Sequence, residues 1–495
     1  MDDDKLKRLK RDREVRRRGR SVEETWSRID RDDGASVKDK LQKLIQLTGA
    51  ARKKPSRPGA AEEARSGEPF PDDIPGDEAI RGSRLSRSGA SHARASRRPD
   101  APFAFEAGDI EPAPREPLRI FEASYPLDDR YGKFRIGDGL KISGEILTTL
   151  SRDEEFLGLD LSTALFIDLE TTGLAGGTGT VPFLVGMGFF RGDRFVVTQY
   201  FLGELGEEER MIGELARFFE EGGFRSVVTY NGKAFDVPLL ETRFVLARRV
   251  YRLSDLPHLD FLFSARHLWK HKHESCRLFH LAREVVNAGR TEDIPSAEIP
   301  YRYFDYLRTG NFDLIEPILY HNVEDILSLL GLVVAGAELF AGHASPGRED
   351  EGALPDPLDL FGVARILESV GDTERSVALF ERALGGGLPS TVEASLKRKL
   401  SLHFKRSAEW EKAVSLWKDL SSDDQLFCFR ELAVYYEHRT RNFAEALRIS
   451  EEGLTLAVRV SDPFESDFRR RIERLNAKMK KAAAADNAPP RKKRA

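Results

Sequence analysis

The chain has 495 residues, which is too long for one ordinary hydrophobic core and predicts two or more domains. Its 78 Lys and Arg residues nearly balance its 82 Asp and Glu residues, so the net charge of -4 does not by itself indicate a polyanion partner. Two cysteines are too few for a disulfide scaffold, and no uninterrupted apolar run approaches the about 18 residues of a membrane span. We therefore expect a cytoplasmic protein with no membrane partner.

Residues 1–115 are rich in Arg, Ser, Gly, Pro and Ala and poor in aromatic residues. This composition buries too little apolar surface to offset chain entropy, so we expect most of the region to be disordered. One exception is 37–48, where apolar residues recur at helical spacing and predict a short helix. Basic runs at 16–18 and 52–54 have the charge to contact phosphates, although a solvated tail explains them better.

Residues 116–342 combine strand and helix patterns. Apolar runs typical of strands occur at 164–169, 183–190, 194–202 and 226–230. A turn at 191–193 joins two of them, which predicts a three-stranded meander, and 207–220 has helical spacing. Strands followed by a helix and a further strand predict an α/β mixed sheet with flanking helices.

A second, all-α domain is predicted at 358–462, after a linker at 343–357. Three similar phrases begin in it at 374, 411 and 444, at offsets of 37 and 33 residues. These offsets are near the about 34-residue period of helix-hairpin repeats, and the phrases resemble degenerate tetratricopeptide (TPR) repeats. The resemblance implies a concave face for a protein partner, while a plain helical bundle is the alternative. We expect 463–495 to pass from a helix into a disordered basic tail.

Four carboxylates lie at the ends of predicted elements. Asp168 and Glu170 are alternate residues of one strand, so both face the same side. A charge at the edge of a core needs a partner, and a multivalent cation suits two acids at this spacing. Asp236 follows another strand and Asp325 lies in a helix pattern, so all four acids are able to meet at one end of the sheet.

This set of acids predicts two Mg²⁺ or Mn²⁺ ions and phosphodiester hydrolysis. Two such ions, about 3.5–4 Å apart, activate a water molecule and stabilise the leaving oxygen, and magnesium prefers hard oxygen ligands. His321 precedes Asp325 by one helical turn and titrates near neutral pH, so we favour it as the general base. Tyr320 points elsewhere on a regular helix and is the second candidate.

The same residues resemble the motifs of the DEDD (DnaQ-like) exonuclease superfamily, which has the ribonuclease H-like fold. Asp168-x-Glu170 with 171–174 matches the first motif, Asn231-x-x-x-Phe235-Asp236 the second, and Asp325 the third. Within the superfamily the chain is most similar to YprB-type proteins, which share the segments at 275–278 and 293–296 and the His-Asn-x-x-Asp helix. The resemblance implies metal-dependent 3'-5' exonuclease activity.

The position of the general base departs from both types of this superfamily. The tyrosine type has Tyr-x-x-x-Asp and the histidine type has His-x-x-x-x-Asp. Here His321 has the tyrosine spacing to Asp325, and Tyr320 has the histidine spacing. The choice between the two therefore stays open, and helical geometry favours His321.

The resemblance also implies contacts to the terminal nucleotide. Asn231 would bond the nucleotide or its phosphate, Phe235 would pack beneath the site, and Thr171 with Leu174 would contact the sugar and base. A turn asparagine, a core phenylalanine and strand-end residues explain the same positions equally well.

The segment 266–277 mixes cations with one aromatic residue. Arg266 and Lys270 are candidates to follow the backbone of a single strand, with Trp269 either stacked on a base or buried. The leading hypothesis is thus an exonuclease acting at single-stranded 3' ends of DNA or RNA. The alternatives are a nucleic-acid-binding scaffold whose repeats recruit a protein while the nuclease-like domain is weakly active or inactive, and a small-molecule phosphodiesterase.

Overall fold

The computed structural model describes residues 118–173, 179–289, 294–344, 355–421 and 425–486, with side chains up to residue 481. All of them belong to one compact unit, 107–495. The disorder expected for 1–115, the helix expected at 37–48, the basic runs and Leu174 lie outside the described residues. The predicted domain boundaries stay predictions.

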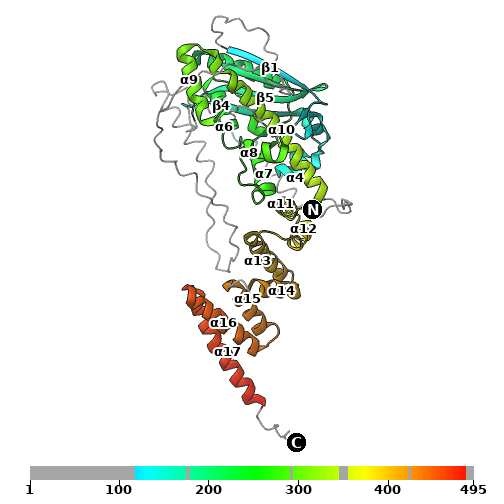
Figure 1. The fold of residues 1–495 in the computed structure, drawn as a ribbon, viewed down its shortest axis with the longest axis vertical. Coiled ribbons are helices and arrows are strands. Elements are labelled where there is room, and N and C mark those ends of the chain that lie inside the picture. Colours follow the sequence, from blue (N-terminus) through cyan, green and yellow to red (C-terminus); the bar gives the residue numbers. More distant parts are fainter. Residues whose placement is uncertain (1–117, 174–178, 290–293, 345–354, 422–424, 487–495) are drawn as a thin grey trace, which may run out of the picture. The chain divides into compact units, whose positions relative to one another are not determined.

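A six-stranded sheet organises the first part of the chain, in the order β1-β6-β5-β4-β7-β8 (Figure 1). Its strands are β1 Leu118–Pro126, β4 Ala164–Thr171, β5 Pro182–Arg191, β6 Arg194–Leu202, β7 Ser226–Thr229 and β8 His258–Asp260. β1, β6, β5 and β4 are antiparallel, whereas β4, β7 and β8 are parallel. This mixed sheet with flanking helices confirms the predicted fold class, and β4, β5 and β6 form the predicted meander.

The strand β1 was not predicted from the sequence. It lies at the edge of the sheet and pairs with β6 along its whole length. None of its residues is fully buried, and the exposed residues Ile120, Glu122 and Ser124 alternate with partly buried ones. An edge strand of this kind has only a weak apolar signal, because its fit depends on a distant partner. A separate short hairpin joins β2 Arg130–Tyr131 to β3 Phe134–Arg135.

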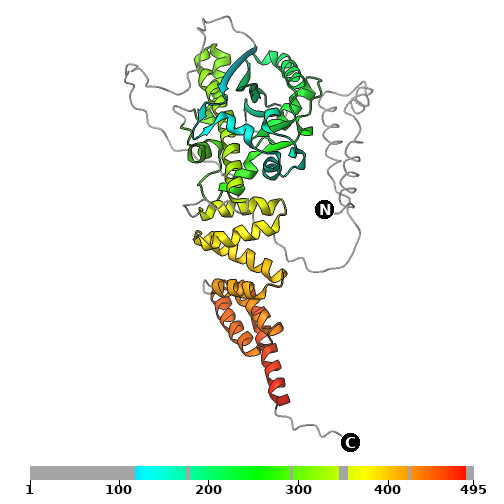
Figure 2. The ribbon, with the colours of Figure 1, turned by 90° about the vertical axis from the view of Figure 1, so that its right-hand side faces the viewer.

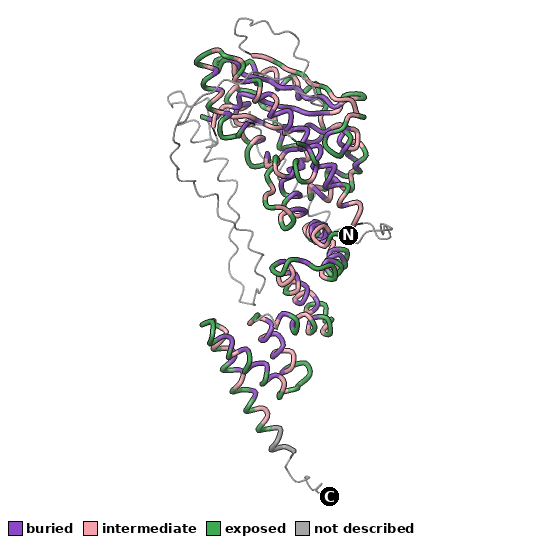
Figure 3. Tube along the Cα trace, in the orientation of Figure 1, coloured by how far each residue is buried: buried purple, intermediate pink, exposed green. Residues whose placement is uncertain are grey.

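Helices cover both faces of the sheet. One face packs against α5 Glu208–Glu221, α6 Asp236–Leu246 and α9 Ile299–Thr309. The other face packs against α4 Gly144–Ser151, α7 Phe261–Trp269 and α10 Glu316–Ala344, and the short α8 Leu278–Leu281 lies beside α10. Figure 3 shows the buried residues concentrated in the strands and in α10. Two apolar cores therefore hold the sheet from opposite sides.

The helix α10 is long and apolar for most of its length. The stretch Phe312–Ala344 has a mean hydropathy of 1.7 in its most apolar window, which is enough in length and composition to cross a membrane. Within the fold, however, 72% of that window is buried, and α10 packs against β4 and β5. Burial on nearly all sides explains its continuous apolar character, as expected for the central helix of a large domain.

The second part of the described chain is all helical, as predicted. Its helices are α11 Pro357–Ser369, α12 Thr373–Gly385, α13 Ser390–Arg406, α14 Trp410–Ser421, α15 Leu426–His438, α16 Phe443–Val460 and α17 Phe464–Asp486. They pack as consecutive pairs, α11 with α12, α13 with α14 and α15 with α16, and α17 packs on α16 (Figure 2). The three recurring phrases lie in α12, α14 and α16, so each falls in the second helix of a pair.

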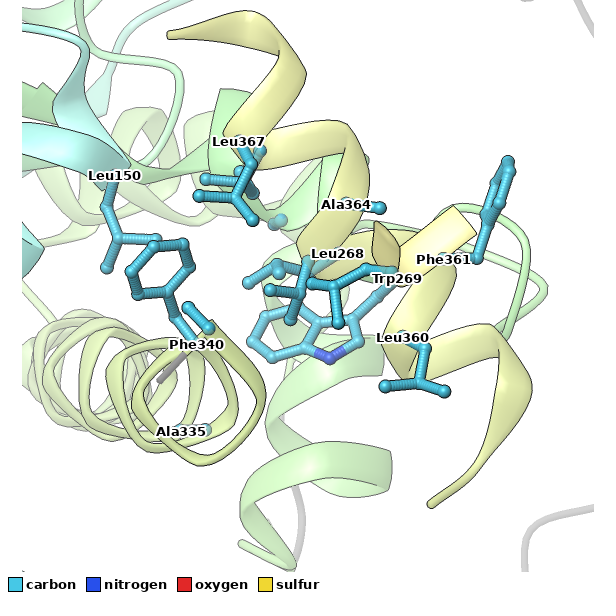
Figure 4. Close-up of a cluster of buried hydrophobic side chains, with 14 of the residues drawn as sticks. Leu150, Leu268, Trp269, Ala335, Phe340, Leu360, Phe361, Ala364 and Leu367 are labelled. Carbon is cyan, nitrogen blue, oxygen red and sulfur yellow. The ribbon is translucent and has the colours of Figure 1, made fainter. Parts of the chain in front are cut away.

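The first helix pair packs directly against the sheet domain. Leu360, Ala364 and Leu367 of α11 meet Leu268 of α7, with Phe340 of α10 nearby (Figure 4). The two helices approach closely at Gly362, which has no side chain. A Cβ at this position would lie only 2.4 Å from the Leu268 carbonyl oxygen. Trp269 is 3% exposed and lies in this cluster. Of the two roles considered for Trp269, the structure therefore supports burial and not base stacking.

Candidate active site

The strand β4 carries the first two acids at the end of its buried run. Phe166 contributes to the core on the α10 side, whereas Ile167 and Leu169 contribute to the core on the α5 side. Because strand residues alternate between faces, Asp168 and Glu170 point to the α10 side. A register shift follows at Glu170 and Thr171, where β4 and β5 stop pairing regularly.

The helix α10 brings a histidine and a third acid to these residues. His321 Nε2 lies 3.4 Å from Asp325 Oδ2 and 3.8 Å from Glu170 Oε1. His321 is 5% exposed, so its ring sits inside the site and not on the surface. The i,i+4 spacing on α10 thus places His321 and Asp325 on one face, as predicted, and that face meets β4.

A buried amide positions the Asp168 carboxylate. Asn322 Nδ2 donates hydrogen bonds to Asp168 Oδ2 at 2.7 Å and to the Asp168 carbonyl at 3.2 Å. Gln199 of β6 donates through Nε2 to Asn322 Oδ1 at 2.8 Å and to the Leu319 carbonyl at 2.9 Å. Asn322 is 0% exposed and Gln199 is 1% exposed. Asn322 and Gln199 therefore hold the Asp168 carboxylate in one orientation. Both amides are buried, and hydrogen bonds are strong in such an environment.

Gly186 makes room for this amide pair. It lies opposite Asp168 on one side and opposite Gln199 on the other. A Cβ at Gly186 would lie 2.0 Å from Asn322 Oδ1, which is less than any normal contact distance. Gln199, Gly186 and the position of Asn322 were missed from the sequence, although a glutamine inside the apolar run 194–202 is itself a signal of a buried polar partner.

We expect Gly186→Ala to separate Asn322 from Asp168. The added methyl group forces the Asn322 side chain to turn away, which leaves buried hydrogen-bonding groups unpaired at a cost of about 1–3 kcal/mol. The melting temperature should fall, and any hydrolytic rate should fall by roughly 100-fold because a ligand moves by about 1 Å. Gly206→Ala is the matched control, since a Cβ there meets nothing within 4 Å. Equal stability and activity in the two variants would contradict the role of Asn322.

The fourth acid comes from the loop after β7. Asp236 is the first residue of α6, and the charge of its carboxylate is stabilised by hydrogen bonds from its own backbone and from the Leu169 backbone on β4. Burial, reinforced by the charge of Asp260, nevertheless raises the pKa of Asp236 to about 7. The bond to Leu169 places Asp236 beside the strand that carries Asp168 and Glu170.

The buried Asp260 fixes the shape of this loop. Its Oδ1 accepts from the Asn231 backbone N–H at 2.7 Å, and its Oδ2 accepts from the Lys233 backbone N–H at 3.0 Å. Asn231 itself has a φ of 70°, in the left-handed region that asparagine tolerates better than most residues. Asn231 was considered either as a contact to the nucleotide or as a turn residue. Its backbone conformation supports at least the role of a turn residue.

Like charges gather around Asp168. Its pKa is raised well above the usual value, first by burial and then by the charges of Asp325, Glu170 and Asp236, while His321 opposes the shift. The other four residues predicted as catalytic are thus close enough to affect the Asp168 carboxylate. They come from β4, the start of α6 and α10, and so from three segments far apart in the sequence.

Tyr320 lies on another side of α10. It acts with Glu324 on the pKa of Tyr125 of β1, which burial chiefly raises. Glu324 is 6% exposed and accepts a hydrogen bond from Tyr131 Oη at 2.9 Å. His321, in contrast, lies 3.4 Å from Asp325 Oδ2 and 3.8 Å from Glu170 Oε1, so the structure places His321 among the acids.

The remaining predicted contact residues lie in the turn after β4, in the loop before α6 and at α7. Thr171 donates its hydroxyl to the Gly173 carbonyl at 3.0 Å, so it shapes the turn after β4. Phe235 is 58% exposed next to Asp236. The expectation that it packs beneath the site is corrected, and it is not a core residue either, because the loop turns its ring outward. Arg266 is exposed and Lys270 is partly exposed, both at the face of α7 that points away from the core.

The donor set suits a divalent cation such as Mg²⁺ or Mn²⁺. Carboxylate oxygens are the hard ligands that these ions prefer, and a cation would offset both the burial and the mutual repulsion that raise the pKa of Asp168. Among the described residues, no three acidic, His or Cys side chains already surround one point as a ready set of ligands. Cation binding would therefore require side-chain movements that draw the carboxylates together.

Residues 165–335 match the RNase_H superfamily. The chain is 32% identical over 369 residues to the Bacillus subtilis (strain 168) protein with the name "Uncharacterized protein YprB", across 72% of this chain and 86% of that protein. A family B DNA polymerase from the hyperthermophilic archaeon Pyrobaculum calidifontis is similar with a TM-score of 0.30 and 17% identity, over 44% of this chain and 28% of the polymerase. The superfamily match runs from β4 into α10, which is the segment that carries the four acids and the histidine of the site.

Proposed function

The chain belongs to the YprB family and carries a domain of the RNase_H superfamily, and on this premise we propose that it is a metal-dependent 3'-5' exonuclease of the DEDD type. The domain has the fold of a nuclease, and nucleic acid is the partner that this fold favours. The observation that supports the proposal best is the grouping of three other acids and one histidine around the partly buried Asp168. A purely structural core gains nothing from such repulsion, because each buried like charge costs free energy.

In this proposal Asp168, Glu170, Asp236 and Asp325 hold two divalent ions, Mg²⁺ or Mn²⁺. When bound, such ions lower the pKa of a water molecule and neutralise charge on the leaving oxygen. Asn322 keeps the Asp168 carboxylate oriented through the 2.7 Å bond to its Oδ2. The attacking water forms a new bond to phosphorus while the bond from phosphorus to the 3' oxygen of the shortened strand breaks, and His321 Nε2 accepts the proton of the water.

Substitutions at the two candidate bases should give different results. We expect His321→Asn to lower kcat by about 100- to 10,000-fold, because a positioned base contributes that much. Tyr320→Phe should lower kcat by less than about tenfold, since Tyr320 lies beside Tyr125 and Glu324. The rate of the Tyr320 variant should keep the rise with pH that reports the base, whereas the His321 variant should lose it. The opposite pattern would identify Tyr320 as the base.

The proposed activity is tested with single-stranded oligonucleotides that carry a label at the 5' end. With Mg²⁺ or Mn²⁺ we expect a ladder of products that shortens from the 3' end, and none with EDTA. Persistent binding without cleavage would favour the scaffold, and turnover of dinucleotides alone would favour the small-molecule phosphodiesterase. DNA and RNA oligonucleotides of one sequence, run in parallel, identify the preferred sugar.

We further propose that α11 to α16 are TPR-like repeats that bind a protein partner in the cytoplasm. The phrases at 374, 411 and 444 support this, because each lies in the second helix of a pair, as expected for a repeated unit. A full-length protein and a variant with charge reversals on these helices should be compared for capture of one and the same partner.

A further inference from the structure

The outward face of α7 carries a stripe of aromatic and basic residues. It lies near the loop 230–235, which precedes Asp236 and is called the catalytic loop below. Phe263 and Arg266 are exposed and Lys270 is partly exposed, whereas Leu262, Ala265, Leu268 and Trp269 of the same helix are buried. The spacing of the three outward residues, i, i+3 and i+7, puts them along one line on a helix. Asp260 caps the N-terminus of this helix and also holds the backbone of the loop before Asp236.

Two further cations connect this stripe to the catalytic loop. The Arg152 guanidinium lies over the Phe263 ring, 5.6 Å from its centroid. Lys233, in the loop, is close enough to Arg152, Asp153 and Asp260 for their charges to affect its pKa. Phe235 follows two residues later, 58% exposed beside the acid Asp236. Arg152 thus lies over a ring of α7 and also within electrostatic range of the loop before Asp236.

The charges on this surface are available to a ligand. In the portion of the chain that the structure describes, none of Arg152, Lys233, Arg266 and Lys270 forms an ion pair with a carboxylate. Lys272, two residues beyond Lys270, shows the contrast, because it pairs with Asp356 at 2.9 Å and with Asp359 at 2.7 Å. These four cations, of which Lys233 also lies near Asp153 and Asp260, are interleaved with two exposed rings, and the set is complementary to a polyanion with stacked bases.

We propose that Phe235, Phe263, Arg152, Lys233, Arg266 and Lys270 form a track for a single nucleic acid strand whose 3' end lies among the catalytic acids. This proposal rests on the proposed exonuclease function and names its substrate as a single strand several nucleotides long. The rings of Phe235 and Phe263 stack on unpaired bases, and the cations contact successive phosphates. A duplex is excluded from this role, because its base faces are already stacked within the helix.

The test uses the full-length chain with Asp168→Asn, so that bound oligonucleotides stay intact, and oligothymidylates of 2 to 12 nucleotides with a 5' fluorophore. We expect affinity to rise with length, and Phe263→Ala to weaken binding of the longest by about tenfold. Arg152→Gln or Arg266→Gln should each lower the slope of log affinity against log salt by about 0.7. Arg308→Gln on α9, which packs on the opposite face of the sheet, is the control with the same charge change and no expected effect.

A second measurement separates this track from the catalytic proposal. In the chain with Asp168 intact, Phe263→Ala should reduce the ratio of kcat/KM for the 12-mer to kcat/KM for the dinucleotide by about tenfold. Cleavage with an unchanged ratio would overturn the track and leave the exonuclease standing. Length-dependent binding that Phe263→Ala weakens, in a chain that cleaves nothing, would support the track and overturn the exonuclease. An equal loss of binding with Arg308→Gln would overturn the track.

Discussion

Asp168→Asn is expected to abolish metal-dependent cleavage and, without metal, to make the protein more stable. Asp168 contacts Asn322 and lies among Glu170, Asp236 and Asp325, so its loss removes the central ligand of the proposed ions. We expect a fall in kcat of at least about 1,000-fold, in line with the contribution of several kcal/mol that such ions make to the transition state. End-labelled oligonucleotide assays with Mn²⁺ measure it.

The sign of the stability change follows from the pKa. The folded pKa of Asp168 is raised above its unfolded value, so folding favours the protonated form and loses stability as pH rises between the two values. Asparagine is neutral and keeps an oxygen for Asn322, so it removes this loss at neutral pH. The melting temperature in EDTA should rise, and Mg²⁺ should raise it further only in the unsubstituted chain.

Two controls make this prediction specific. Asp305→Asn, at an exposed ion pair with Arg308 on α9, changes the same charge and should leave cleavage and melting temperature nearly unchanged. Cleavage by the Asp168→Asn chain at more than about one tenth of the normal rate would contradict the assignment of Asp168 as a metal ligand. A melting temperature that falls in EDTA would show that the carboxylate has a structural role.

Glu437→Gln is expected to destabilise the last helices by about 3 kcal/mol, because it removes a buried carboxylate and leaves the buried Arg471 without its counter-charge. The Glu437 side chain is 0% exposed on α15, and Arg471, Arg474 and Lys478 of α17 each reach it at 2.8 Å. The bonds from Arg474 above all, and then those from Lys478, lower the pKa of Glu437 to about 2. One carboxylate thus joins α17 to the rest of the helical part.

Hydrogen exchange of the full-length chain measures this effect locally. We expect the amides of α15 to α17 to exchange roughly 100-fold faster in the variant, while those of β4 and β5 stay unchanged. Glu445→Gln is the control, since Glu445 pairs with Arg448 at the surface of α16 and should contribute less than about 1 kcal/mol. Equal exchange rates in the two variants would contradict the prediction.

The depressed pKa of Glu437 also sets a pH window. A carboxylate whose folded pKa lies below its unfolded value contributes stability that is complete above the unfolded pKa of about 4.3 and is lost as pH falls toward about 2. The unsubstituted protein should therefore lose protection of α17 between these values. The Glu437→Gln chain should show little change over the same range.

The parts of the fold that depend on local pattern could be predicted from the sequence. The meander β4 to β6 follows from apolar runs and one tight turn, and the shared face of Asp168 and Glu170 follows from strand alternation. The shared face of His321 and Asp325 follows from helix geometry in the same way. These features need no knowledge of distant partners, and the structure shows each of them.

The parts that depend on distant partners could not be predicted. Gln199 and Asn322 lie 123 positions apart, and only the packing of β6 on α10 makes them one hydrogen-bonded pair. From the sequence, Gly186 is only a glycine that weakens a strand. The structure shows that its missing side chain makes room for Asn322. The outward direction of Phe235 depends on a loop whose backbone is held by Asp260, a residue that no motif marks.

The helix α10 extends from the candidate site to the first helix of the helical part. Its first turns carry His321 and Asp325, and Phe340, near its other end, packs with α11. Nineteen residues separate His321 from Phe340, which at about 1.5 Å per residue makes a rod of roughly 28 Å. Pivoting such a rod by about two degrees at its far end displaces the catalytic end by about 1 Å, a shift of the size that lowers rates by about 100-fold.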